Sequence, residues 1–157
     1  MKKLVVALAL LSSASAHAGF DEAVKAYYSG DYETAMKEYQ ALVSQGDSRG
    51  EFGLGYLYHY GHGVPRNEPE ANKWFRLAAD HGDVQARYYL GNQYLKGEGV
   101  EKDPIAAHVW FSLYSREAPN DRDRAYTKEI MTKIERKLTE DQIAKAKKMA
   151  AEWKPGK

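Results

Sequence analysis

Residues Leu54–Asp83 have the sequence "LGYLYHYGHGVPRNEPEANKWFRLAADHGD", which returns in altered form as "LGNQYLKGEGVEKDPIAAHVWFSLYSREAPND" at Leu90–Asp121. When residues 52–83 are placed over residues 88–119, an offset of 36, ten positions carry the same residue. The identical pairs are Leu54/Leu90, Gly55/Gly91, Tyr58/Tyr94, Gly61/Gly97, Gly63/Gly99, Val64/Val100, Ala71/Ala107, Trp74/Trp110, Phe75/Phe111 and Leu77/Leu113. Self-similarity at this period predicts a solenoid of helical hairpins.

Each unit predicts two helices joined by a glycine-rich loop. The first helix should end at Gly61 or Gly97, and the second should begin at the N-cap residue Asn67 or Asp103. Gly55 lies inside the first helix, where glycine lowers helix propensity, so we expect the partner helix to approach closely there. The second helix is expected to bury Ala71, Trp74, Leu77 and Ala78 in one unit and Ala107, Trp110, Phe111 and Tyr114 in the next.

These two units resemble the Sel1-like repeat family, whose members are related to tetratricopeptide repeat proteins. The resemblance implies an all-α fold, a right-handed solenoid of helical hairpins with capping helices at its C-terminal end. The first copy follows the family pattern closely. The second departs from it where Tyr114-Ser115 replaces an Ala-Ala pair and Pro119 follows, so we expect the array to end there.

The flanking sequence completes the expected domain organisation. "AYYSGDYETAMKEYQALVSQGD" resembles a tetratricopeptide hairpin, so residues 19–47 are expected to form a degenerate first unit before repeats at 48–83 and 84–119. Residues 120–157 should form a capping helix pair, since solenoids need ends that close the core. Its expected apolar stripes are Tyr126, Ile130, Ile134 and Leu138, then Ile143, Ala146, Ala150 and Trp153, with a capping box from Thr139 to Gln142. We expect a complete small protein.

The N-terminus predicts a signal peptide over residues 1–18. Two lysines precede an apolar run of eight residues, and Ala16-His17-Ala18 has the form of a cleavage site. We expect cleavage after Ala18 or, alternatively, after Ala16, and hence a periplasmic or secreted protein. The alternative interpretation is a buried N-terminal helix. The chain has no cysteine, so we expect neither a lipid anchor nor stabilisation by disulfides. Its formal net charge of +1 gives no reason to expect binding to nucleic acid or to a membrane surface.

Several motifs suggest chemistry and are better explained by structure. "GHGV" and "GEGV" lack the strand and third glycine of a dinucleotide fingerprint, so their glycines should end helices and their valines should fill the core. "GDSRG" at 46–50 matches a nucleophile elbow but follows a helix, and Ser48 is better explained as an N-cap. His59, His62 and His81 could form a metal site, although surface histidines are the simpler interpretation. Some family relatives act on β-lactams, but the S-x-x-K signature is absent.

The resemblance places the first helix of each hairpin on the concave surface. The expected partner-binding residues there are Arg49, Phe52, Tyr56, His59, Tyr60, Gln85, Tyr88, Asn92 and Lys96, with Tyr27 and Tyr28 from the degenerate unit. Tyr and Arg are enriched in binding hot spots, although such rings also pack between helices. The sequence thus predicts an adaptor for a protein or peptide, with no catalysis, cofactor or metal. The alternatives are a cell-envelope hydrolase or enzyme subunit acting on polysaccharide, for which Glu51 and Glu98 are available acids, and a structural module that dimerises through its cap helices.

Overall fold

The computed structural model of the protein describes residues 18–156, which form helices and, within that range, no strands. The first described helix covers residues 18–29. It is followed by α2 (Tyr32–Ser44), α3 (Ser48–Tyr60), α4 (Glu68–Asp80), α5 (Val84–Lys96), α6 (Pro104–Glu117), α7 (Asp121–Glu135) and α8 (Glu140–Glu152). The predicted signal peptide lies, apart from Ala18, outside the described residues. Among residues 18–156, no helix combines the length and apolarity needed to cross a membrane.

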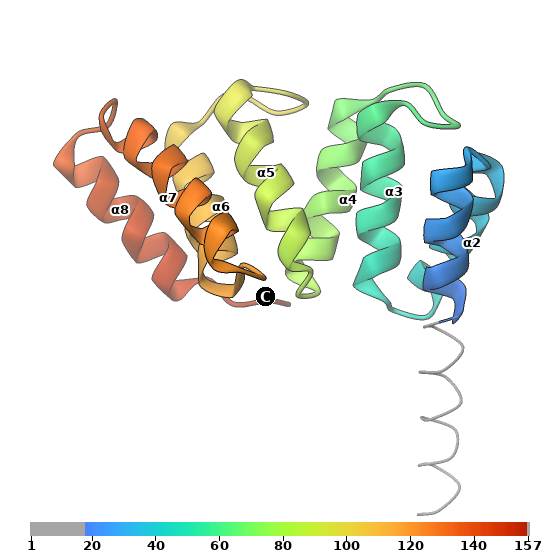
Figure 1. Ribbon diagram of the computed structural model, residues 1–157. Helices are drawn as coiled ribbons and strands as arrows, with labels where there is room; N and C mark the ends of the chain where they lie inside the picture. Colours follow the sequence, from blue (N-terminus) through green and yellow to red (C-terminus); the bar gives the residue numbers. More distant parts are fainter. Residues whose placement is uncertain (1–17, 157) are drawn as a thin grey trace, which may run out of the picture.

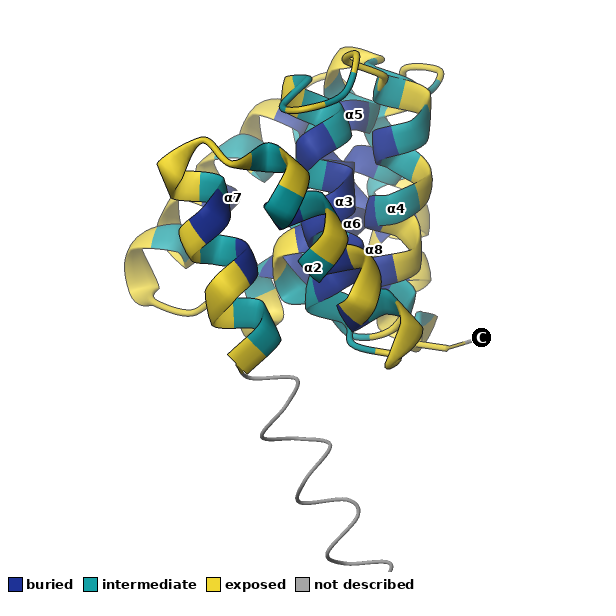
Figure 2. Ribbon diagram, turned by 90° about the vertical axis from the view of Figure 1, so that its right-hand side faces the viewer, coloured by how far each residue is buried: buried dark blue, intermediate teal, exposed yellow. Residues whose placement is uncertain are grey.

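Consecutive helices stack side by side from one end of the molecule to the other (Figure 1). Each of the helices α2 to α6 contacts the next one along the chain, and α6 also contacts α8. Buried positions lie on the sides of the helices that face their neighbours, whereas the loops are mostly exposed (Figure 2). The described part of the chain is therefore an all-α helical-repeat solenoid, as the repeat predicted.

The helix ends follow the predicted chemistry. Gly61 and Gly97 end α3 and α5 in the left-handed conformation, with φ values of 69° and 79°, which L side chains rarely adopt. Asn67 and Asp103 cap α4 and α6 through their side chains, so these predictions are confirmed. Ser48 is different, because the N-cap of α3 is Asp47, whose carboxylate accepts from the backbone N–H of Arg49.

The predicted close approach at Gly55 is confirmed. A Cβ atom placed on Gly55 would lie 2.7 Å from ring atoms of Phe75 in α4. The same arrangement occurs in the next hairpin, where a Cβ on Gly91 would lie 2.8 Å from the ring of Phe111 in α6. Each glycine therefore leaves the space that the phenylalanine of its partner helix fills.

The buried stripe of α4 differs from the prediction. Phe75 and Ala79 join Ala71 and Ala78 in the core, all with no exposed surface. Leu77 keeps 38% of its surface exposed, and Trp74 is only partly buried. The reason is that residues 71, 75, 78 and 79 share the helix side that faces α3 and α5, and positions 74 and 77 fall at its edges. The stripe predicted for α6 is fully buried and confirmed.

Both helices of the C-terminal pair close the core against α6, α7 through Ile134 and α8 through its alanines. Ala146 and Ala150 are buried in the same cluster as Trp110, whose ring lies 5.9 Å from that of Trp153. The predicted capping box at Thr139 is confirmed. Tyr126, however, belongs to the apolar stripe predicted for α7 but keeps 54% of its surface exposed, because it lines an open hollow with Tyr88 and Tyr114.

Candidate functional site

The first helices of successive hairpins present a continuous row of aromatic rings, which we call the aromatic face. Tyr28 contacts Tyr27 on the helix over residues 18–29, and the Tyr27 ring lies 5.4 Å from that of Tyr56 on α3. Tyr56 in turn lies 5.6 Å from Tyr89 on α5, and Tyr89 lies 6.0 Å from Tyr88. Ring contacts thus connect three hairpins, which fixes the spacing of the rings relative to one another.

Three hollows open along the aromatic face, and together their walls include every predicted binding residue. The first, about 180 Å³, is lined by Phe20, Val24, Tyr27, Tyr28, Tyr39, Arg49, Phe52 and Tyr56. The second, about 190 Å³, is lined by His59, Tyr60, Tyr88, Tyr89, Asn92, Lys96 and Glu98. The third, about 450 Å³, is lined by Gln85, Tyr88, Tyr89, Tyr114, Arg122, Asp123 and Tyr126.

The predicted residues differ in how freely they face solvent. Tyr60, Gln85 and Lys96 are exposed, and 45% of the Tyr60 surface is open. Phe52 and Tyr56 are partly buried within the ring row, so they support its shape as well as line the hollow. The most open ring of the aromatic face is that of Tyr28, which was predicted from the degenerate unit and keeps 81% of its surface exposed.

The polar members of the predicted set are held by neighbours. Arg49 forms a bidentate ion pair with Asp47 and lies 4.5 Å above the Phe20 ring. Asn92 donates a hydrogen bond of 3.0 Å to the backbone carbonyl of Tyr88. The ammonium group of Lys96 lies 3.6 Å from the carboxylate of Glu98. These contacts restrict the side chains before any ligand arrives.

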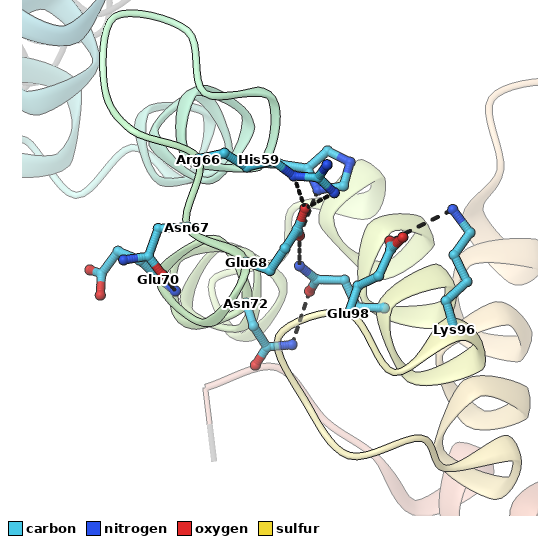
Figure 3. Close-up of polar contacts among 9 residues, drawn as sticks. His59, Arg66, Asn67, Glu68, Glu70, Asn72, Lys96 and Glu98 are labelled. Carbon is cyan, nitrogen blue, oxygen red and sulfur yellow. Dashed lines mark hydrogen bonds and ion pairs between the residues drawn. The ribbon is translucent and has the colours of Figure 1, made fainter.

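His59, which lines the second hollow, also belongs to a partly buried polar network (Figure 3). The Glu68 carboxylate bonds to Nδ1 of His59 at 2.8 Å and accepts hydrogen bonds from Arg66 and Gln93. Gln93 also accepts a hydrogen bond of 2.9 Å from Asn72. Burial would raise the pKa of Glu68, but the hydrogen bonds from His59 and Arg66 outweigh it and lower that pKa. The network joins α3, α4 and α5 at one carboxylate and so fixes the angle between two hairpins.

The hydroxyls of Tyr27 and Tyr89 remain protonated at neutral pH, because the pKa of each is raised. Burial raises the pKa of the Tyr89 phenol, and the nearby hydroxyls of Tyr60 and Tyr56 raise it further. Burial likewise raises the pKa of Tyr27, whose hydroxyl bonds to the His62 ring at 2.8 Å. These two hydroxyls are therefore neutral groups that can donate or accept hydrogen bonds.

The three histidines considered as metal ligands do not meet. His59 bonds to Glu68, His81 bonds to the buried carboxylate of Glu51, and His62 stacks on Tyr32 at 4.7 Å. Within residues 18–156, no group of three or more His, Cys, Asp or Glu side chains is placed to hold a metal ion. His59 is also not a surface histidine, because only 16% of its side chain is exposed.

Sequence reasoning missed Tyr89 and the residues that α7 adds to the third hollow. Tyr89 contacts Phe52, Tyr56 and Phe75, so it is central to the aromatic face. Its counterpart in the first unit is Gly53, so comparison of the two units did not indicate an aromatic residue at this position. The signal that could have found it is the doublet Tyr88-Tyr89, which matches Tyr27-Tyr28 upstream.

The class of protein that the fold and this face define is an all-α solenoid of helical hairpins with an aromatic surface on its first helices. The Sel1 repeat family model matches residues 48–83 and 84–114. Residues 48–83 and 84–114 of the chain are therefore two Sel1 repeats. Repeats of this family typically form a non-catalytic scaffold, which suggests a role in protein–protein interaction.

Two solved structures share the fold. One is a protective antigen of uropathogenic Escherichia coli strains that displays an SLR fold. Its sequence is 28% identical to this chain, and the two structures superimpose with a TM-score of 0.76. The match covers 86% of this chain and 29% of that chain. The other is a Sel1 repeat protein from Oxalobacter formigenes, 29% identical with a TM-score of 0.62, over 69% of this chain and 43% of that chain. This chain thus spans less than half the length of either protein. A search of curated proteins gave no significant match.

Proposed function

We propose that the protein is an exported, periplasmic adaptor that binds a protein or peptide partner on the aromatic face and carries out no catalysis. The observation that supports this most strongly is the row of rings from Tyr28 to Tyr88, which three hollows interrupt. Exposed tyrosines surrounded by packed rings have the properties of interface hot spots.

The partner that fits this face is an extended peptide segment. Its apolar or aromatic side chains would enter the hollows, and its backbone would form hydrogen bonds with phenol hydroxyls such as that of Tyr60. Because ring contacts and side-chain hydrogen bonds already order the face, association would cost little further side-chain entropy.

Peptide selection against the purified protein tests the binding proposal. Peptides selected from a random library on the wild type are titrated against a Tyr28→Ala/Tyr60→Ala variant, which truncates the two most open rings on the first helices of the hairpins. A loss of about ten-fold or more in affinity is expected, since hot-spot truncations cost ~2 kcal/mol or more. Met149→Ala is the matched control, because Met149 is 44% exposed on α8. Equal losses in both variants, or none in either, would count against the aromatic face.

Export is tested separately by expressing the full chain in a Gram-negative host. N-terminal sequencing of the periplasmic protein should begin at Gly19 or, for the alternative cleavage, at His17. Recovery of the uncleaved chain in the cytoplasm would contradict the export part of the proposal and leave the binding part untouched.

A further inference from the structure

A second kind of site lies away from the aromatic rings, where the end of α5 and the start of α6 meet the C-terminal half of α7. A groove of about 410 Å³ opens there. This volume falls in the range of ligand pockets, about 300–1,000 Å³, at its small end. The groove has no part in the proposed adaptor function.

The floor of the groove is apolar. It is formed by Leu95 from α5, Pro104 from α6, and Ile130 and Ile134 from α7. Ile134 is 3% exposed and belongs to a core cluster against which Leu95 and Ile130 pack. The floor is therefore a fixed extension of the core, and an alkyl group could displace water from it favourably.

The rim of the groove is cationic. Lys102, Lys133 and Lys137 complete its lining, which contains no acidic side chain. Lys133 pairs with Glu129 at 2.7 Å, whereas no ion pair to another described residue is found for Lys102 or Lys137. Two ammonium groups thus stand unneutralised at the edge of an apolar surface, an arrangement that suits an anionic head on an apolar tail.

The repeat shows how this groove arises. At an offset of 36, Leu95, Lys102 and Pro104 correspond to His59, Arg66 and Glu68 of the first unit. There the three side chains form a closed network, since Glu68 bonds to both His59 and Arg66 (Figure 3). In the second unit an apolar side chain replaces the histidine, a proline replaces the carboxylate, and the cation is left without its partner.

We propose that this groove binds a single-chain amphiphilic anion, a medium-chain carboxylate in its simplest form. The chain would lie on Leu95, Ile130 and Ile134, and the carboxylate would pair with Lys102 and Lys137. A peptide fits less well, because the side chains that line the groove offer no hydrogen-bonding groups except ammonium donors. A bilayer fits less well, because the apolar floor is a hollow between helices and not a protruding surface.

Methyl NMR of the full chain tests this proposal with decanoate, below its micelle concentration, and decanol as its uncharged match. Decanoate should shift the methyl signals of Leu95 and Ile130 in a saturable way and bind about ten-fold more tightly than decanol, as two exposed charge pairs allow. Lys102→Gln/Lys137→Gln should remove that preference. Lys25→Gln/Lys145→Gln, which makes the same change in charge at exposed positions elsewhere, should preserve it.

A Leu95→His/Pro104→Glu variant installs the first unit's residues and should close the groove, abolishing decanoate binding while the amide spectrum stays folded. Equal affinity for decanoate and decanol, unchanged affinity in the lysine variant, or shifts confined to the aromatic face would each overturn the proposal. Shifts with anionic phosphatidylglycerol vesicles but none with monomeric decanoate would assign the groove to a membrane surface and would also overturn it.

Discussion

Gly55→Ala tests the packing that defines each hairpin. The added methyl carbon would lie 2.7 Å from two ring atoms of Phe75, a ring with no exposed surface that stacks on Tyr89 at 4.8 Å. Because these neighbours hold the ring, the helices must separate or the ring must leave its rotamer, at a cost of ~1–3 kcal/mol. Alanine returns about 1 kcal/mol of helix propensity. The expected net loss is about 1 kcal/mol of unfolding free energy, or about 3 °C in Tm.

Urea unfolding followed by circular dichroism at 222 nm measures this loss. Gly91→Ala provides an internal replicate, because its methyl carbon would lie 2.8 Å from the Phe111 ring in the next hairpin. A double-mutant cycle with Phe75→Leu measures the energetic coupling between positions 55 and 75. Because the smaller leucine leaves room for the methyl group, Gly55→Ala should lower the unfolding free energy less in the Phe75→Leu background than in the wild type.

The sign of the effect is the decisive result. An unhindered glycine inside a helix gains about 1 kcal/mol of stability when it becomes alanine. If Gly55→Ala and Gly91→Ala both stabilise the protein by that amount, the glycines are not required for close approach and the account of the hairpin is wrong.

Three further predictions concern stability. Trp110→Ala should cost about 3–5 kcal/mol because that ring is 3% exposed, whereas Trp74→Ala should cost clearly less because Trp74 is only partly buried; urea unfolding compares the two. Thr139→Ala removes the capping box of α8 and should cost about 1 kcal/mol in the same assay. A hydrogen bond from His108 lowers the pKa of Glu135, so this carboxylate stabilises the fold above its unfolded pKa of about 4.3, and that stabilisation is lost as the pH falls through its folded pKa. The stability advantage of the wild type over Glu135→Gln should therefore shrink below about pH 4.3, and an advantage that grows with acidity would contradict this assignment.

The hairpin architecture could be predicted because its determinants are residues whose roles are local. Gly61 and Gly97 end their helices because glycine readily adopts the left-handed conformation that this position requires. Gly55 lies against Phe75, and the same pair recurs at the same separation in the next unit. Comparison of the two units revealed these positions without knowledge of any long-range contact.

The make-up of the aromatic face could be predicted only in part. Residues aligned with the repeat, such as Tyr56 and Tyr88, were found, but Tyr89 was not, because glycine occupies its counterpart and Tyr39 fills the space there. Arg122 and Tyr126 join the third hollow from α7, outside the repeat, and their approach to α5 is a tertiary contact that no sequence spacing encodes.

The two repeats also show how one scaffold carries two surfaces. The positions that set the hairpin geometry are internal glycines, caps and phenylalanines, so changes beside the loop do not disturb the fold. His59 and Glu68 in one unit become Leu95 and Pro104 in the other, and the glycine turn between them keeps the same conformation. A closed polar network that supports the aromatic face can therefore become an apolar groove with an unpaired lysine through a few substitutions. Because each hairpin contacts chiefly its neighbours, the two surfaces can change independently of each other.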